Sequence, residues 1–189
     1  MSREIEKTVQ EEADLLVAFV NTCDLEAESE ELADPAQLQA WIEAASGEFL
    51  PDVDAEDLER VRALRESLRA LLRANNGGAA DDEELAPLRE AAERSRYRPT
   101  ISAGGLLGLV PARADLTGFE ARLVLAVERV QSHGAWARLK ACAADECRWA
   151  FFDTTRNRSR TWCSMEECGN REKTRRYRQR KGSPGAASG

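Results

Sequence analysis

The stretch LKACAADECRWAFFDTTRNRSRTWCSMEECGNREKTRRYRQRK, residues 139–181, decides how the chain is organised. Two cysteine pairs, each spaced C-x4-C, are separated by fifteen residues: Cys142, Cys147, Cys163 and Cys168. Zinc needs four converging ligands, and two closely spaced pairs supply two ligands from each of two local turns. Two disulfides are the alternative, which a reducing cytoplasm disfavours, and a redox dithiol usually has one pair of narrower spacing. The pattern therefore predicts one structural zinc ion.

Around these cysteines the sequence predicts a small finger over residues 138–181. The expected elements are a knuckle turn over 142–147 and a β-hairpin made of strands 148–152 and 159–162. Ser164 and Glu167 have the spacing of a capping box, so a helix should begin just before them and hold Cys168 in its first turn. Knuckle, hairpin and helix form a treble-clef-like arrangement in which the metal sets the direction of the helix.

Basic residues gather in this part of the chain. Residues 138–189 carry 13 Lys and Arg against 6 Asp and Glu, whereas residues 1–137 carry 14 against 28. Such a split indicates an acidic body with an end that attracts polyanions, although mutual neutralisation of the two parts is the alternative. Arginine guanidinium groups bind phosphate and read guanine edges. The predicted nucleic-acid contacts are Arg156, Asn157, Arg158, Arg160, Asn170, Arg171, Arg175, Arg176 and Arg178.

DNA is the favoured partner, because a helix fits a major groove about 12 Å wide. An RNA- or ribosome-associated role would use the same helix, with Trp149, Phe152 and Tyr177 stacking on bases. A role as a protein-interaction adaptor also stays open. One finger has a small footprint, so specific DNA binding favours a homodimer.

The body, residues 1–137, reads as mostly α-helical with one small β-hairpin. Apolar residues at helical spacing and capping residues predict five helices: 4–21, one starting at Asp34, one from Asp54 to Asn75, 82–95, and one from Leu116 to His133. Residues 97–102 and 106–110 flank a glycine-containing turn and predict the hairpin.

No catalytic motif stands out in this body. His133, the only histidine, lies at a predicted helix end, where terminal carbonyl groups are its expected partners. The acidic run 81–84 is read as a helix first turn, and Cys23 as an idle thiol. Because four thiolates leave zinc no open position, we expect no enzymatic activity.

The expected compartment is the cytoplasm, without contact with a membrane. No apolar run approaches the roughly 18 residues of a membrane span, and the acidic N-terminus does not read as a signal peptide. Residues 182–189 are rich in glycine, serine and alanine, which predicts a disordered tail.

Residues 139–181 resemble the CGNR zinc finger, named for the tetrapeptide at 168–171. The cysteine spacing and the segments 153–159 and 162–165 carry the resemblance. The body resembles the ABATE domain that precedes this finger in many bacterial proteins, since LVAFVNT at 16–22 corresponds to its LDFVNT-like motif, with Ala18 at the usual aspartate. The resemblance implies a stress-induced transcriptional regulator: a body that senses a small-molecule effector and a finger that binds DNA.

Overall fold

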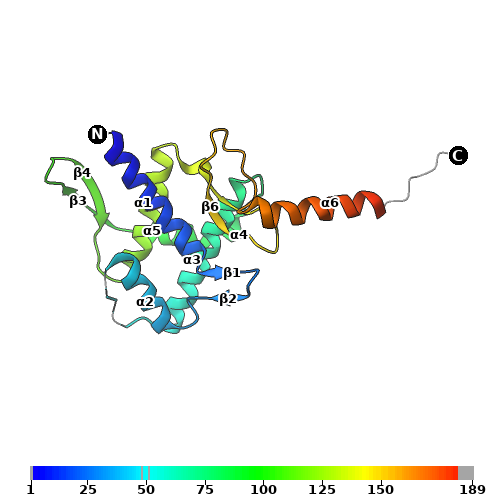
Figure 1. Ribbon diagram of the computed structural model, residues 1–189. Helices are drawn as coiled ribbons and strands as arrows, with labels where there is room; N and C mark the ends of the chain where they lie inside the picture. The colour runs from blue at the N-terminus through cyan, green and yellow to red at the C-terminus, as the bar shows by residue number, and fades with distance from the viewer. Residues whose placement is uncertain (1, 48, 51, 183–189) are drawn as a thin grey trace.

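The computed structural model describes residues 2–47, 49–50 and 52–182, without the side chains of 2–6, 176 and 179–182. Of the predicted tail at 182–189, residues 183–189 lie outside the described residues, and Gly182 ends the last helix. The elements are, in order, α1 (Ser2–Val20), β1 (Cys23–Asp24), β2 (Ser29–Glu30), α2 (Pro35–Ser46), α3 (Ala55–Ala74), α4 (Asp82–Arg94), β3 (Tyr97–Ile101), β4 (Leu107–Pro111), α5 (Leu116–Ser132), the 3-10 turn η1 (Trp136–Arg138), β5 (Leu139–Ala141), β6 (Ala150–Phe152), the π-helical turn η2 (Met165–Gly169) and α6 (Asn170–Gly182). The fold is mostly α-helical with small antiparallel hairpins (Figure 1).

Aspartate side chains begin the helices of the body after α1. In each case the carboxylate accepts a hydrogen bond from a backbone N–H three residues later, which satisfies a donor that the first turn leaves free. The caps are Asp34 for α2, Asp54 for α3, Asp81 for α4 and Asp115 for α5. The helices predicted from the sequence are confirmed, including the proline that follows the α2 cap.

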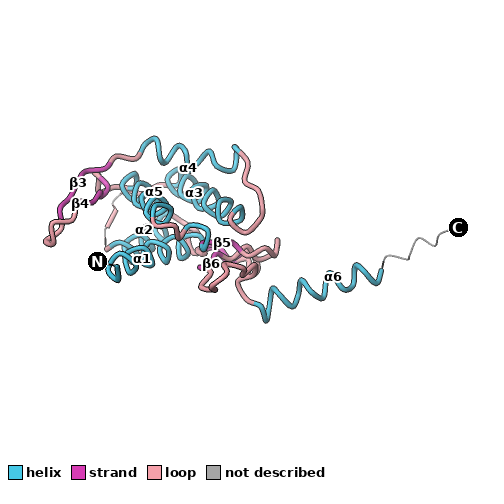
Figure 2. Tube along the Cα trace, turned by 90° about the horizontal axis from the view of Figure 1, so that it is seen from above, coloured by secondary structure: helices cyan, strands magenta, loops and turns pink. Residues whose placement is uncertain are grey.

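The body's core lies among α1, α2, α3 and α5, with α4 packed against α3 and α5 (Figure 2). Three aromatic rings meet at its centre: Phe19 from α1, Trp41 from α2 and Phe119 from α5, with centroids 5.5 to 6.0 Å apart. The apolar face that helical spacing predicted for α1 is the face that is buried here. Leu16 and Val20 lie on it and are at most 1% exposed.

The hairpin predicted in the body is confirmed as β3 and β4, in a register that pairs Ile101 with Leu107. It extends away from the helices at the end of the molecule opposite α6 (Figure 1). A second hairpin, β1 with β2, was not predicted, since each strand is only two residues long.

The hairpin of the finger differs from the prediction. Strand β6 pairs with β5, which precedes the first cysteine, and not with residues 159–162. The reason is burial: Leu139, Ala141 and Ala150 are at most 1% exposed and belong to the core of the body. The knuckle therefore sits at the tip of a hairpin that the body holds, and the predicted boundary between residues 137 and 138 stays a prediction.

None of the helices in the described ranges is long and apolar enough to cross a membrane.

Candidate metal centre and basic helix

The four cysteine sulfurs of the finger converge, all within 4.8 Å of one another. The Sγ of Cys163 lies 3.6 Å from that of Cys147 and 3.7 Å from that of Cys168. Zinc–sulfur bonds of about 2.3 Å in tetrahedral geometry place the sulfurs about 3.8 Å apart. The cluster therefore fits one zinc ion, and four thiolates complete its coordination as in structural sites.

The first cysteine pair lies on a tight knuckle between β5 and β6. The N–H of Cys142 donates to the carbonyl of Trp149 at 2.8 Å, and that of Cys147 donates to Ala144 at 3.0 Å. Arg148 then adopts a left-handed backbone with φ 50°, which turns the chain back into β6. The predicted knuckle is confirmed.

The second pair spans the start of the C-terminal helix. Ser164 caps the η2 turn, and its hydroxyl accepts from the N–H of Glu167 at 3.2 Å. Cys168 lies within this turn, as predicted, and α6 follows directly. A Cβ on Gly169 would lie 2.6 Å from Sδ of Met165, so the backbone approaches that side chain closely. The metal ligands and the basic helix are therefore one continuous segment.

The electrostatics of the four thiols favour a bound cation. A hydrogen bond from Cys147 lowers the pKa of Cys142 to about 5, and the same contact raises the pKa of Cys147. Burial raises the pKa of Cys163 to about 12 and also raises that of Cys168. Four thiolates at these distances repel one another, and a divalent cation removes that repulsion.

The loop between β6 and the second cysteine pair is built around a buried carboxylate. Asp153 is 0% exposed and accepts hydrogen bonds from the N–H and hydroxyl of Thr155, the N–H of Arg160 and Nζ of Lys140, at 2.6 to 2.9 Å. This network explains why residues 159–162 do not form the predicted strand. Their backbone groups bond to the carboxylate, to Lys140 and to the knuckle.

Among the predicted contacts on this loop, Arg156, Asn157 and Arg158 are exposed. Arg160 is partly buried, and its guanidinium group donates to the carbonyls of Trp162 and Cys163 and lies over the ring of Phe151, 4.8 Å from its centroid. Arg160 thus holds the chain that leads into the second cysteine pair.

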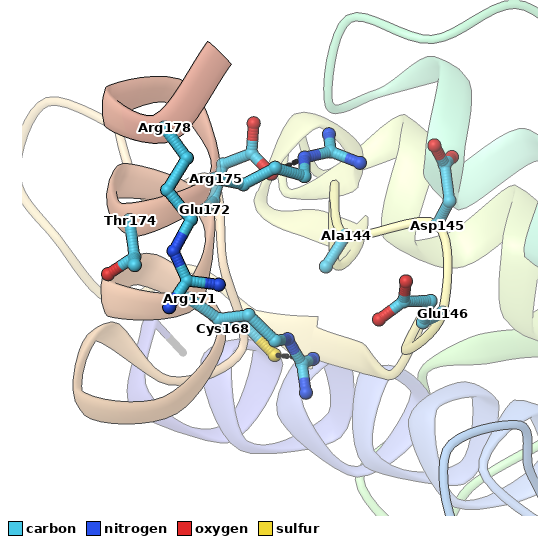
Figure 3. Close-up of a pocket in the computed structure, with 9 residues that line it drawn as sticks. All are labelled: Ala144, Asp145, Glu146, Cys168, Arg171, Glu172, Thr174, Arg175 and Arg178. Atoms are coloured by element: carbon cyan, nitrogen blue, oxygen red, sulfur yellow. Dashed lines mark hydrogen bonds and ion pairs between the residues drawn. The ribbon is translucent and has the colours of Figure 1, made fainter. Parts of the chain in front are cut away.

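Three of the predicted contacts on α6 line a hollow of about 490 Å3 between this helix and the knuckle (Figure 3). Its lining includes Arg171, Arg175 and Arg178 from the helix and Asp145 and Glu146 from the knuckle. Arg175 and Arg178 are exposed, and Nε of Arg175 lies 2.9 Å from the carboxylate of Glu172. The three arginines share one side of the helix, as their spacing predicted.

Arg171 ties the helix to both the metal centre and the body. One of its nitrogens lies 3.3 Å from Sγ of Cys168, and both terminal nitrogens bond to the carboxylate of Glu26, which raises the pKa of Arg171. Asn170 donates to the carbonyl of Glu166 within its own turn. The side chain of Arg176 lies outside the described residues.

Several residues that join the body to the finger were missed by the sequence analysis. Asn21 both donates to and accepts from the backbone of Ala150 in β6, at 3.0 and 2.7 Å. Asn75 and Asn76, at the end of α3, donate to four carbonyls of the segments around β5 and Thr161. Asn21 belongs to the motif at 16–22, which could have indicated a structural role, whereas the pair at 75–76 was read only as a helix end.

Comparison with protein-family models finds two matches. Residues 138–181 match the CGNR zinc finger, and residues 13–148 match ABATE, described as "Putative stress-induced transcription regulator". The two matches overlap over the strand β5 and the knuckle, where the structure also joins body and finger. A search of curated proteins finds no match to the chain.

Proposed function

Because this chain belongs to the ABATE family and carries a CGNR zinc finger, we propose that it is a transcriptional regulator that binds duplex DNA through helix α6. The body would sense a small-molecule effector, and zinc would set the direction of the helix. The observation that carries the proposal is the helix itself, which extends away from the body as an isolated arm (Figures 1 and 2).

The dimensions and charge of α6 suit a DNA groove. Its thirteen residues include seven basic residues and one acidic residue. At about 1.5 Å per residue it is about 20 Å long, and a helix about 10–12 Å across enters a major groove about 12 Å wide. Phosphate groups on both sides of the groove would then meet its arginines.

Helix α6 is the main basic surface, because the body is acidic: residues 1–137 carry twice as many acidic as basic residues. Its acidic side chains would repel DNA and orient the finger toward it. A DNA phosphate approaching Arg171 would compete with the carboxylate of Glu26. The predicted loop residues Arg156 and Arg158 would add further phosphate contacts.

Two observations favour DNA over base stacking on RNA. Trp149 packs against the cysteine cluster, and Phe152 packs against the core of the body. Of the three aromatic residues considered for stacking, Tyr177 is the exposed one, at 55%. A single accessible ring gives little platform for unstacked bases.

The remaining parts of the proposal concern the metal and the assembly. Four thiolates fill a tetrahedral zinc site, so the metal would be structural and the protein would have no enzymatic activity of its own. Reduced thiols fit the cytoplasm. Two copies binding as a homodimer would supply the footprint that one short helix lacks.

Fluorescence anisotropy with zinc-loaded protein and a labelled DNA duplex tests the proposal. Arg175→Gln combined with Arg178→Gln should weaken binding about tenfold or more, because two charged hydrogen-bond donors are lost. The matched control, Arg89→Gln combined with Arg98→Gln, removes the same charge from the body and should leave the affinity unchanged. Equal losses in both double variants would contradict a role for α6.

A competition experiment tests whether the protein prefers duplex DNA or structured RNA. At matched salt, unlabelled duplex DNA should displace the labelled duplex at a lower concentration than structured RNA does. If RNA displaces the labelled duplex at the lower concentration, RNA and not DNA is the preferred partner.

A further inference from the structure

A cavity of about 270 Å3 lies where α3 and α4 of the body meet the zinc knuckle. Arg148, the residue that follows the zinc ligand Cys147, lines it from the finger, and Ser67 lines it from α3. The volume lies just below the range of roughly 300–1,000 Å3 that holds drug-sized ligands. The cavity would therefore take a smaller molecule.

Two residues that line this cavity each carry a buried polar atom without a hydrogen-bond partner. In the described part of the chain, three buried side-chain polar atoms lack a hydrogen bond, and two of them are Oγ of Ser67 and Nε of Arg148. Ser67 is 1% exposed. Buried polar groups are nearly always hydrogen-bonded, so two such atoms in residues beside one cavity are consistent with a ligand that accepts hydrogen bonds.

The residues that α4 contributes to the lining offer hydrogen-bond acceptors. Pro87 lies inside α4 and has no N–H to donate to the carbonyl of Glu83, four residues earlier. Glu83 and Pro87 both line the cavity, and the carboxylate of Glu83 makes no ion pair within the described residues. This part of the lining therefore suits a group that donates hydrogen bonds.

The charges around the cavity balance. Its lining holds three carboxylates and three guanidinium groups: Glu66, Glu83, Glu84, Arg69, Arg73 and Arg148. Within the lining, Arg69 pairs with Glu66 and Arg73 with Glu84. Glu83 and Arg148 remain as opposite charges for the two ends of a zwitterion.

We propose that this cavity binds a small zwitterion of the α-amino-acid class. Its carboxylate would accept from Ser67 and Arg148, and its ammonium group would donate to the carboxylate and carbonyl of Glu83. The inference rests on the sensing role proposed for the body and gives that role a site.

The position of the cavity links a ligand to the metal centre. The carbonyl of Arg148 accepts from the guanidinium group of Arg69 at 3.0 Å, and the N–H of Arg148 donates to Ala144 in the knuckle at 3.0 Å. A ligand held by the Arg148 side chain would thus bind directly to the residue that follows the zinc ligand Cys147. Its binding would order the knuckle on which the direction of α6 depends.

Isothermal titration calorimetry of the zinc-loaded full chain, without nucleic acid, tests the site. The probes are the twenty protein amino acids, with acetate and ethylamine as the two half-molecules. At least one amino acid should bind, and both half-molecules should bind at least tenfold more weakly. Absence of binding by all twenty at millimolar concentrations, or equally tight binding of acetate, would overturn the proposal.

Single-residue variants test whether the measured binding occurs in this cavity. Arg148→Lys keeps the positive charge but lacks the Nε–H donor and should weaken binding about tenfold or more. Ser67→Ala should weaken it about fivefold without lowering the melting temperature, since the hydroxyl has no hydrogen bond to lose. Arg98→Gln, on a separate cavity beside β4 and α5, should have no effect.

Binding that survives Ser67→Ala and is lost in Arg98→Gln would place the ligand elsewhere and overturn the proposal. Ser67→Ala decides the question even if Arg148→Lys disturbs the knuckle. Because calorimetry uses no DNA, failure of DNA binding and failure of this site remain distinguishable.

Discussion

The buried ion pair between Lys140 and Asp153 should carry much of the stability of the finger. Nζ lies 2.9 Å from the carboxylate, and the two side chains are 6% and 0% exposed. Asp153→Asn keeps the shape but leaves the ammonium group buried without its counter-charge. Breaking a buried pair costs about 3–5 kcal/mol. Lys140 also donates to the carbonyls of Arg158 and Arg160, so we expect the lower end, about 3 kcal/mol of the free energy of unfolding.

Urea unfolding followed by tryptophan fluorescence measures this loss. The matched control is Asp145→Asn, whose carboxylate lies 3.7 Å from Arg148 and is 75% exposed. Exposed pairs contribute little, so the control should change the free energy by less than about 0.5 kcal/mol. A loss below about 1 kcal/mol in Asp153→Asn would refute the reasoning that this carboxylate organises the loop.

The pH dependence of the free energy of unfolding provides a second test of this prediction. Burial alone would raise the pKa of Asp153, but hydrogen bonds from Thr155 and Lys140 outweigh burial and hold the pKa well below its usual value. The stabilisation is therefore complete above the unfolded pKa, about 3.9, and is lost as the pH falls toward the folded value. The difference between wild type and Asp153→Asn should stay constant from pH 7 to about pH 5 and shrink below about pH 4. A difference that grows on acidification would contradict this assignment.

Three further predictions concern the junction, the body and the metal. Asn21→Ala removes both hydrogen bonds to Ala150 and should lower the free energy of unfolding by about 2 kcal/mol in urea titrations; no measurable loss would show that the contact is dispensable. Gly118→Ala would place a Cβ 2.1 Å from the carbonyl oxygen of Arg113, so a cost of about 1–3 kcal/mol should appear as a lower melting temperature; an unchanged melting temperature would count against the packing described. Zinc chelation should raise amide hydrogen exchange in the knuckle and η2 while β5 and β6 stay protected in the body's core, as hydrogen-exchange mass spectrometry can show; loss of protection in α3 at the same time would contradict this.

Local signals made most of the fold predictable. Aspartate caps, a proline after a cap and apolar residues at helical spacing depend on neighbours within a few residues. The structure confirms the helices that they predicted, from α2 to α5. The cysteine spacing was sufficient for the metal centre for the same reason, because each pair is positioned by its own turn.

Contacts between distant segments were not predictable in this way. Arg65 and Arg69 lie on α3 among leucines and would be expected to face solvent, yet each is only 3% exposed. Arg69 donates to carbonyls of Val20, Cys23 and Arg148, up to 79 residues away in the sequence. The sequence around these arginines has no pattern that indicates such distant partners.

The wrong strand pairing in the finger has the same origin. Residues 159–162 follow the strand and a turn, which is a local reason to pair them with 148–152. Leu139 and Ala141 instead pair with β6, because the body's core offers them burial. The Asp153 network then holds the intervening loop, and its partner Lys140 lies on β5.

The salt dependence of duplex DNA affinity, measured by anisotropy with zinc-loaded protein, tests the central claim most directly. Five of the predicted contacts are arginines exposed in the structure: Arg156, Arg158, Arg171, Arg175 and Arg178. If each neutralises one phosphate, the logarithm of the affinity should fall with the logarithm of salt concentration at a slope of about −4 to −5. Chelation of zinc should abolish that binding. A slope near zero, or no DNA binding by the zinc-loaded protein, would contradict the account.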